Sequence, residues 1–330
     1  MQSFKIRNIQ IQNRTVLAPL AGFTFLPFRI LAKKGGCGLV YSEMVSANGL
    51  KHNSKKTEEM LQTVSFEKPL AVQIFGSNPS IMAEAASFIE NKGIDIIDIN
   101  FGCSVKKVVK NGAGAALMKD LHKAESILKE VRKAINIPLT IKIRTGWNIG
   151  GNESFELAKI AEDCGVDAIA IHPRAAVQGF RGNADWSIIK KIKEMISITV
   201  IGNGDILTAY DALKMINFTG CDAVMVGRVA ISDPYIFAKI NSVLEGKEPD
   251  NIEIISQFEV INDYIDNCYE FFGEKRTTFL LKGKVGFFVR GFPFSSQFRE
   301  SITKINSISQ AKEIIKKYEL QLLETIQTVD

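Results

Sequence analysis

The 330-residue sequence lacks the features that mark several classes of protein. No run approaches about 18 consecutive apolar residues, so we expect no membrane span. No low-complexity tract is present, and the composition, with 46% hydrophobic and 23% charged residues, is that of an ordinary globular chain. The first residues contain no charged segment followed by an apolar one, so we expect no signal peptide.

Cysteine is scarce, and its spacing excludes two common uses. The chain has five cysteines, an odd number, and no CxxC pair. This pattern argues against a disulfide framework or a zinc cage, so we expect reduced thiols in a cytoplasmic protein and no metal site. Four of the five are expected to be small core residues: Cys37, Cys164, Cys221 and Cys268. The fifth, Cys103, follows an apolar run and precedes three lysines.

Eight short apolar runs recur along the first part of the chain, and they predict strands. The runs are 15–20, 38–44, 70–76, 94–100, 138–146, 166–174, 198–206 and 221–228. Most are separated by segments of helical period, for which the expected N-caps are Ser77 or Asn78, Asp120 and Thr208. A related phrase, Gly-x-Asp followed by an apolar strand, recurs at 93–100, 165–172 and 220–227. Eight strands alternating with helices predict an α/β protein with a (β/α)8 TIM barrel.

A doubly wound sheet is the alternative fold, but it usually has fewer strands and a GxGxxG after the first strand. Here the first run ends in APLAG. After about residue 245 the strand rhythm stops, and the ranges 251–273, 275–292, 295–305 and 307–326 are expected helices. The segment 245–251 is the expected linker. The predicted domains are therefore a barrel over 1–244 and a smaller, all-helical domain over 245–330.

Polar residues gather where the predicted strands end, which is where TIM barrels carry their active sites. They are Glu43, Gln73, Asn100, Cys103, Lys142, Arg144, His172, Asn203, Asp205 and Arg228. Lys142 and Arg144 lie two residues apart and therefore share one face of their strand. Two cations at that place require an anionic or electron-rich partner. The alternative is that they form core ion pairs with Glu43 or Asp98, and that Gln73 and Asn100 are satisfied core amides.

The last two predicted strands end in IGNGDI and VGR. Gly204 and Gly227 expose backbone N–H groups there, and a helix follows each, which is typical of a phosphate site. A phosphate site combined with Lys142, and with amides that match a ring's polar edge, suggests FMN. A lysine near the flavin stabilises its anionic reduced form.

The charge distribution suggests a polyanionic partner. The net charge is only +5, and residues 245–330 contain 11 Lys and Arg against 14 Asp and Glu. Between 275 and 304, however, there are seven cations and the single acid Glu300. This sorting is typical of a surface that contacts a phosphate backbone, and it nominates Lys282, Lys284 and Arg290 as residues that bind such a backbone. The alternative is an amphipathic helix pair with a solvated basic face.

Together these segments resemble the tRNA-dihydrouridine synthase family, nearest its bacterial B-type branch. The matching segments are NRTVLAPLAGFTFLPFR, YSEMVSANGL, AVQIFGSNP, DINFGCSVKKVVKNGAGAALM, IKIRTGWN, IHPRAAVQGFRGNADW, VIGNGDI and VGRVAISDPYIF. The resemblance implies a flavin barrel with a helical C-terminal domain. It also implies reduction of the C5–C6 double bond of uridine in tRNA, with NADPH, or NADH, as the reductant.

The resemblance assigns roles to individual residues. Cys103 is implied to be the catalytic acid, which gives a proton to C5 while reduced flavin gives a hydride to C6. The implied FMN contacts are Pro19, Ala21, Gln73, Lys142, His172, Asn203, Gly204, Asp205, Gly227 and Arg228. The implied substrate contacts in the barrel are Asn100, Lys106, Lys107, Arg144 and Arg174. No protein partner is expected, and we predict a monomer.

Three positions depart from the family pattern: Ser104 replaces a proline, Phe25 an aspartate and Ala175 a threonine. We expect these departures to affect the efficiency and the choice of uridine more than the reaction itself. Two other functions remain open. One is an FMN-dependent reductase or dehydrogenase of a free pyrimidine, such as dihydroorotate, which would not need a basic helical domain. The other is a non-catalytic RNA-binding barrel, and retention of Cys103 and Lys142 argues against it.

Overall fold

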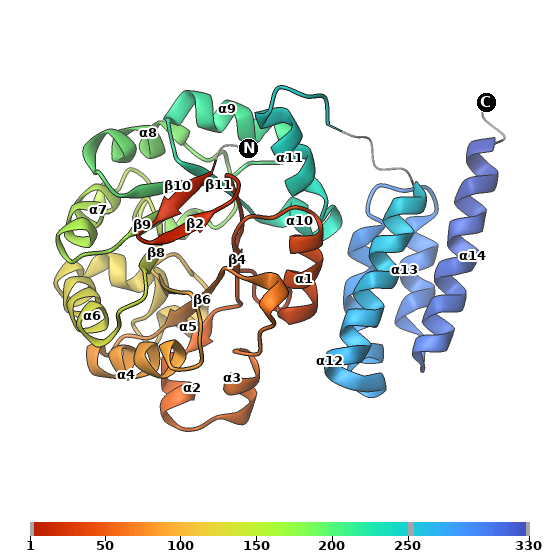
Figure 1. Cartoon of the computed structure of the whole chain (residues 1–330), viewed down its shortest axis with the longest axis horizontal. Helices are drawn as coiled ribbons and strands as arrows, with labels where there is room; N and C mark the ends of the chain where they lie inside the picture. Colours follow the sequence, from red (N-terminus) through yellow and green to blue (C-terminus); the bar gives the residue numbers. More distant parts are fainter. Residues whose placement is uncertain (1–2, 250–253, 328–330) are drawn as a thin grey trace.

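The computed structural model describes residues 3–249 and 254–327, and its larger part is a barrel of eight parallel strands (Figure 1). The strands are β3 (Thr15–Leu17), β4 (Val40–Tyr41), β6 (Leu70–Phe75), β7 (Ile96–Asn100), β8 (Leu139–Arg144), β9 (Ala168–His172), β10 (Thr199–Asn203) and β11 (Ala223–Val226). Their order is β3-β11-β10-β9-β8-β7-β6-β4, and a bridge between Val16 and Leu39 joins the two end strands. All eight predicted strands are confirmed.

Three further strands were not predicted. β1 (Phe4–Ile6) and β2 (Ile9–Ile11) form an antiparallel hairpin, and β5 (Val45–Ser46) pairs with β6. Phe4, Ile6 and Ile11 are buried in one cluster with residues of the barrel interior, so the hairpin covers the N-terminal end of the barrel. Each hairpin strand alternates apolar and polar residues, but over three residues only, which is shorter than the four to eight that identify a strand by its period.

Helices surround the barrel. They are α1 (Leu26–Lys34), α2 (Ala47–Lys51), α3 (Lys55–Glu59), α4 (Pro79–Glu90), α5 (Lys106–Val109), α6 (Leu121–Ala134), α7 (Glu153–Asp163), α8 (Trp186–Met195), α9 (Ala209–Thr219), α10 (Arg228–Ser232) and α11 (Ile236–Leu244). The caps predicted at Asp120 and Thr208 are confirmed, and of the two candidates for α4 the cap is Asn78 and not Ser77. Asn78, Asp120 and Thr208 each accept a hydrogen bond from a backbone N–H of the first turn of α4, α6 and α9.

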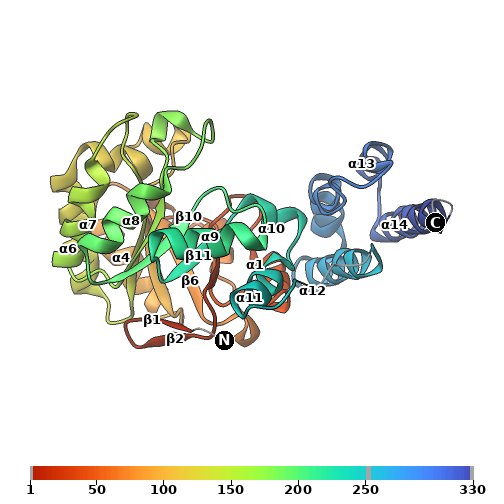
Figure 2. The same ribbon diagram turned by 90° about the horizontal axis from the view of Figure 1, so that it is seen from above.

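The C-terminal helices lie to one side of the barrel (Figures 1 and 2). They are α12 (Ile254–Phe288), α13 (Ser295–Thr303) and α14 (Ile308–Gln327). α12 is broken at Gly273, whose φ of 69° and ψ of 178° are not helical, so the predicted end of one helix near residue 273 is confirmed. Residues 250 and 251 of the predicted linker lie outside the described residues, and the domain boundary near 244 stays a prediction.

α12 packs against α1 and so joins the helices to the barrel. The ring of Phe25, just before α1, lies 6.3 Å from that of Tyr264 and 5.8 Å from that of Phe272. Lys34 and Asp263 form an ion pair at 2.8 Å across the same contact. No helix within the described ranges is long and apolar enough to cross a membrane.

Strand register decides which side chains face the barrel interior. Lys142 pairs with Asn100 on one side and Ala170 on the other, and Gln73 pairs with Asp98. Because side chains alternate between the two faces of a strand, Asp98 and Asn100 point the same way. The interior therefore has a polar layer at the carboxyl ends of the strands, above small residues such as Ala168.

Candidate active site

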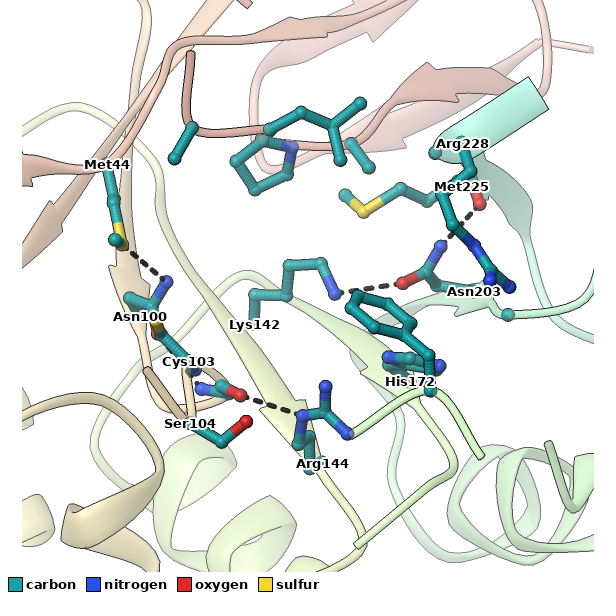
Figure 3. A pocket seen from close by; sticks show the side chains of 18 of the residues that line it. Met44, Asn100, Cys103, Ser104, Lys142, Arg144, His172, Asn203, Met225 and Arg228 are labelled. Carbon is teal, nitrogen blue, oxygen red and sulfur yellow. Dashed lines mark hydrogen bonds between the residues drawn. The ribbon is translucent and has the colours of Figure 1, made fainter. Parts of the chain in front are cut away.

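A pocket of about 270 Å³ opens at the carboxyl ends of the strands (Figure 3). Its lining includes Cys103 and every residue predicted to contact a flavin. These are Pro19, Ala21, Gln73, Lys142, His172, Asn203, Gly204, Asp205, Gly227 and Arg228, and the pocket also reaches Asn100 and Arg144. Residues spread over more than 200 positions of the chain thus meet in one site, as the barrel topology requires.

Lys142 stands in the middle of the pocket wall, and Asn203 fixes its position. The ammonium group of Lys142 donates to Asn203 Oδ1 at 2.9 Å, and Asn203 Nδ2 donates to the carbonyl of Met225 at 2.7 Å. The carbonyl can only accept, so it sets the orientation of the Asn203 amide and turns the amide oxygen toward Lys142. The lysine is therefore held in the pocket by a hydrogen bond rather than by a carboxylate.

Arg144 holds two loops of the site together. Its guanidinium donates to the carbonyl of Gly102 at 2.8 Å, in the Cys103 loop, and to the carbonyls of Ala175 and Gly179 at 3.1 and 2.9 Å. Arg144 is buried, and burial lowers its pKa. Arg144 is therefore held by backbone carbonyls, and not by the ion pair with Glu43 or Asp98 that we considered as an alternative.

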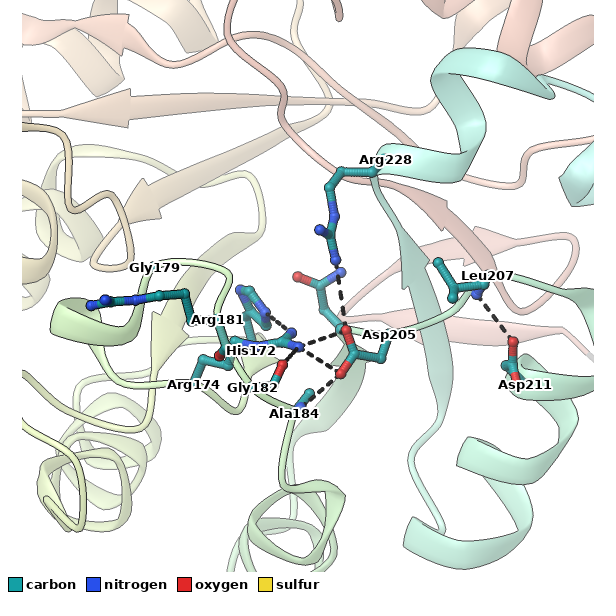
Figure 4. A network of polar contacts seen from close by, with 12 residues as sticks. His172, Arg174, Gly179, Arg181, Gly182, Ala184, Asp205, Leu207, Asp211 and Arg228 are labelled. Atoms are coloured by element: carbon teal, nitrogen blue, oxygen red, sulfur yellow. Dashed lines mark hydrogen bonds and ion pairs between the residues drawn. The ribbon is translucent and has the colours of Figure 1, made fainter. Parts of the chain in front are cut away.

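Arg174 and Asp205 form a second polar network beside the pocket (Figure 4). Arg174 Nη2 donates to both carboxylate oxygens of Asp205, at 2.8 and 2.7 Å, and Arg174 Nη1 lies 3.1 Å from His172 Nε2. Arg228 lies 3.6 Å from the same carboxylate. Arg174 is 2% exposed and does not line the pocket, so the structure places it behind the wall rather than in reach of a substrate.

The site is electropositive. His172 is buried among the cations Lys142, Arg144, Arg174 and Arg228, and burial together with these charges lowers its pKa to about 2. Burial and the neighbouring Arg144 lower the pKa of Lys142 to about 8. Both shifts show that further positive charge is unfavourable here, and an anion in the pocket would relieve the repulsion.

The buried His172 predicts an acid sensitivity of folding. Its pKa is about 2 in the folded chain against an ordinary 6.5, so below about pH 6.5 the unfolded chain binds a proton that the folded chain does not, and stability is lost as pH falls. For His172→Gln this contribution disappears. The advantage of the wild type over the variant in free energy of unfolding should therefore fall by about 2 kcal/mol between pH 7 and pH 5.

Urea denaturation of both proteins at the two pH values measures this difference. The pKa of buried Asp98, raised to about 6, acts with the opposite sign, but it is common to both proteins and cancels in the comparison. His122→Gln, on the exposed face of α6, is the matched control for loss of a histidine. An identical pH dependence in the wild type and His172→Gln would show that the folded chain protonates His172 readily.

The remaining predicted RNA contacts lie outside the pocket. Lys106 and Lys107 are exposed on α5, directly after the Cys103 loop. Lys282 and Arg290 line a second hollow of about 440 Å³ on the helical part, together with Arg299. Lys284 is only half-exposed, and its ammonium group lies 3.7 Å from the ring centroid of Phe23 in the barrel.

Some residues of the site were missed by sequence reasoning. Phe180 is 60% exposed at the pocket, with the guanidinium of Arg228 4.9 Å from its ring centroid. Phe180 lies between Gly179 and Gly182 in a polar segment of the sequence. A large aromatic residue in such a segment has no apolar partner nearby, and this could have marked Phe180 as a candidate binding residue. Met44 also lines the pocket, and nothing in its local sequence marks it.

The three departures from the family pattern take different places. Ser104 lines the pocket beside Cys103. Phe25 packs on α12 instead of facing the pocket. Ala175 contributes backbone only: its carbonyl accepts from Arg144, and its N–H donates to Gln178. None of them displaces a predicted flavin contact from the lining.

Two comparisons with known sequences agree on a family. Residues 16–327 match the model of the dihydrouridine synthase family. A probable tRNA-dihydrouridine synthase of Rickettsia conorii is 36% identical over 323 residues, which cover 97% of this chain and 98% of that one. A tRNA-dihydrouridine synthase B of Vibrio parahaemolyticus is 38% identical over 315 residues, 95% of this chain and 98% of the relative.

Solved structures share the fold only. A 2-naphthoyl-CoA reductase matches with a TM-score of 0.59 at 16% identity, over 74% of this chain and 52% of that one. A 6-hydroxypseudooxynicotine amine oxidase matches with a TM-score of 0.60 at 14% identity, over 79% and 52%. The TIM barrel and the resemblance to tRNA-dihydrouridine synthases, an oxidoreductase family, are confirmed. The chain belongs to the dihydrouridine synthase family.

Proposed function

We propose that this chain reduces the C5–C6 double bond of uridine in tRNA to dihydrouridine, with FMN bound in the barrel and NADPH or NADH as reductant. One observation supports this most strongly: in a chain of this family, Cys103 and Lys142 line one pocket at the carboxyl ends of the strands. The pocket thus combines a proton donor with a fixed cation, which reduction of a pyrimidine ring requires.

The residues present fit FMN. Three cations, Lys142, Arg144 and Arg228, line the pocket, and its carboxylate, Asp205, is already paired with arginines. A Cβ added at Gly227 would meet nothing closer than 3.8 Å, so the backbone there is open to a ligand. A cationic wall with exposed backbone suits the phosphate of FMN, and amide side chains suit the polar edge of its ring.

The chain's own residues then have distinct tasks. Bound FMN supplies the hydride for C6 of the uracil. Lys142, held by Asn203, would place positive charge beside bound FMN and stabilise its anionic reduced form. Cys103 is partly exposed at the pocket, unlike the other four cysteines, which are buried. Its thiol holds the proton for C5, and the target base must leave its stack to reach it.

RNA contacts are proposed on two surfaces that flank the pocket. Lys106 and Lys107 are exposed beside the Cys103 loop. On the other side, Phe287 lines the hollow of the helical part and packs edge-on against Phe23, with ring centroids 5.2 Å apart. Phe23 lies two residues along the chain from Ala21, which lines the pocket, so this ring pair joins the helix that borders the hollow to the loop that borders the pocket.

The cofactor is tested by purification. We expect a yellow protein that releases FMN on denaturation. Arg228→Ala should weaken FMN binding by about 1.5–3 kcal/mol, because it removes one charged hydrogen bond. Arg181→Ala, in the neighbouring loop but outside the pocket lining, is the matched control. A colourless protein that takes up no FMN would rule out the proposed chemistry.

The substrate is tested by mass spectrometry of tRNA from a strain that lacks this protein. We expect one or more positions that carry dihydrouridine in the wild type to remain uridine, which is lighter by two hydrogens, and these positions identify the target. Turnover of free uracil or orotate, with no change in tRNA, would instead support the free-pyrimidine reductase. Normal FMN binding with neither activity would support a non-catalytic RNA-binding barrel.

A further inference from the structure

A continuous chain of hydrogen bonds runs from the barrel interior to the Cys103 loop. Gln73 Nε2 donates to Asp98 Oδ2 at 2.7 Å, and Asn100 Nδ2 donates to Gln73 Oε1 at 2.7 Å. Asn100 Oδ1 in turn accepts from the backbone N–H groups of Cys103 and Gly102, at 2.8 and 3.1 Å. Asp98 is fully buried and lies outside the pocket lining, so the proposed chemistry has no direct use for it.

The two ends of this chain dictate its direction. An ionised carboxylate only accepts hydrogen bonds, and a backbone N–H only donates. Asp98 therefore requires the NH₂ group of Gln73 on its side, which leaves the Gln73 oxygen for Asn100. The backbone of Cys103 requires the Asn100 oxygen, which leaves the Asn100 NH₂ group for Gln73. Both ends demand the same orientation of both amides.

We propose that Asp98 is a positioning residue for Cys103 and acts through these two intervening amide side chains. A buried, unpaired polar group is costly, so the carboxylate penalises any flipped arrangement of the amides. With the amides fixed, the Cys103 backbone keeps its acceptor and the thiol keeps its place over the pocket. The backbone carbonyl of Cys103 also accepts from the N–H of Ala115, at 2.9 Å. Both the N–H and the carbonyl of Cys103 are therefore hydrogen-bonded, which fixes the loop at this residue.

Charges around Asp98 fit an ionised group at mildly alkaline pH. Burial raises the pKa of Asp98 to about 6, while hydrogen bonds from Thr140 and Gln73 and the charge of Lys142 act to lower it. Thr140 Oγ1 donates to Asp98 Oδ1 at 2.6 Å and lies 3.4 Å from Tyr41 Oη. This second hydrogen bond does not lead toward Cys103, and Thr140→Val therefore provides a matched control.

The test measures the reactivity of Cys103 with iodoacetamide, in the full chain saturated with FMN at about pH 8. The other four cysteines are buried, so the fast label reports Cys103. We expect Asp98→Ala to raise the labelling rate roughly tenfold, as loss of a hydrogen bond to a charged group implies. Gln73→Met, which is similar in size and breaks the chain in the middle, should give the same result and serves if Asp98→Ala does not fold.

Asp98→Asn should label at nearly the wild-type rate, because its side-chain oxygen can still accept from Gln73 while its NH₂ group donates to Thr140. Thr140→Val should also label at the wild-type rate. Wild-type labelling of both Asp98→Ala and Gln73→Met, with the fold intact by circular dichroism, would overturn the proposal. So would labelling of Thr140→Val as fast as that of Gln73→Met, since the effect would then be general loosening of the interior.

The consequence for catalysis rests on the proposed function and is measured separately. Two rates are compared in Asp98→Ala and Gln73→Met: reduction of the flavin by NADPH, and oxidation of the reduced flavin by tRNA. The second rate should fall roughly tenfold more than the first. If the labelling rates change as expected but wild-type protein does not modify tRNA, the proposed function fails and the positioning role stands. If tRNA is modified but labelling never changes, the positioning role fails alone.

Discussion

Cys103→Ala should slow oxidation of the reduced flavin by tRNA by about 10²–10⁴-fold, the usual contribution of a positioned acid. The reason is that the thiol lines the pocket and the variant has no proton to give at that atom. FMN binding and reduction by NADPH should stay close to wild type, because neither needs the thiol. Anaerobic stopped-flow absorbance of the flavin resolves the two half-reactions.

Two variants sharpen this result. Ser104→Ala removes one polar atom from the neighbouring residue of the pocket lining and should have a much smaller effect, which controls for local disturbance of the loop. Cys103→Ser keeps a weaker acid and should fall between alanine and the wild type. Turnover by Cys103→Ala at the wild-type rate would show that the proton reaches C5 from another group.

Reversing the charge of Lys282, Arg290 and Arg299 should weaken tRNA binding on the order of 10²-fold near physiological salt, because each cation that pairs with a phosphate releases counterions on binding. The slope of log affinity against log salt should become shallower by about one for each cation–phosphate pair that the reversal removes. The three residues line one hollow. Lys284 is left in place, since its ammonium group packs on Phe23 of the barrel and its substitution would disturb that packing.

The matched control reverses Lys312, Lys316 and Lys317, which are exposed on α14 in the same helical part. The two triple variants have the same net charge, so a difference between them locates the RNA surface. Oxidation of NADPH with oxygen as acceptor should be normal in both. Equal tRNA affinity in both variants would exclude the hollow from RNA recognition.

Several features could be read from the sequence because they depend on local pattern. The eight strands, the caps Asn78, Asp120 and Thr208, and the break near Gly273 all follow from hydrophobic period or from the conformational preference of one residue. The polar strand ends that meet at the pocket also followed, since the topology of a TIM barrel fixes where strand ends meet, but Met44 and Phe180 of the lining did not. The hairpin over 4–11 did not, because its strands alternate apolar and polar residues over only three positions each and contain no longer apolar run.

Other features were decided only by tertiary structure. Arg144 and Arg174 look alike in the sequence, as cations at strand ends, yet one bridges two loops at the pocket and the other is buried on Asp205 behind it. Lys284 belongs to a basic run in the sequence, but its place over Phe23 depends on how α12 packs on the barrel. Local sequence determined which elements form and which end of the barrel carries the polar residues. The partner of each charge depends on residues distant in sequence. The same holds for Gln73, which only packing brings within 3 Å of both Asp98 and Asn100.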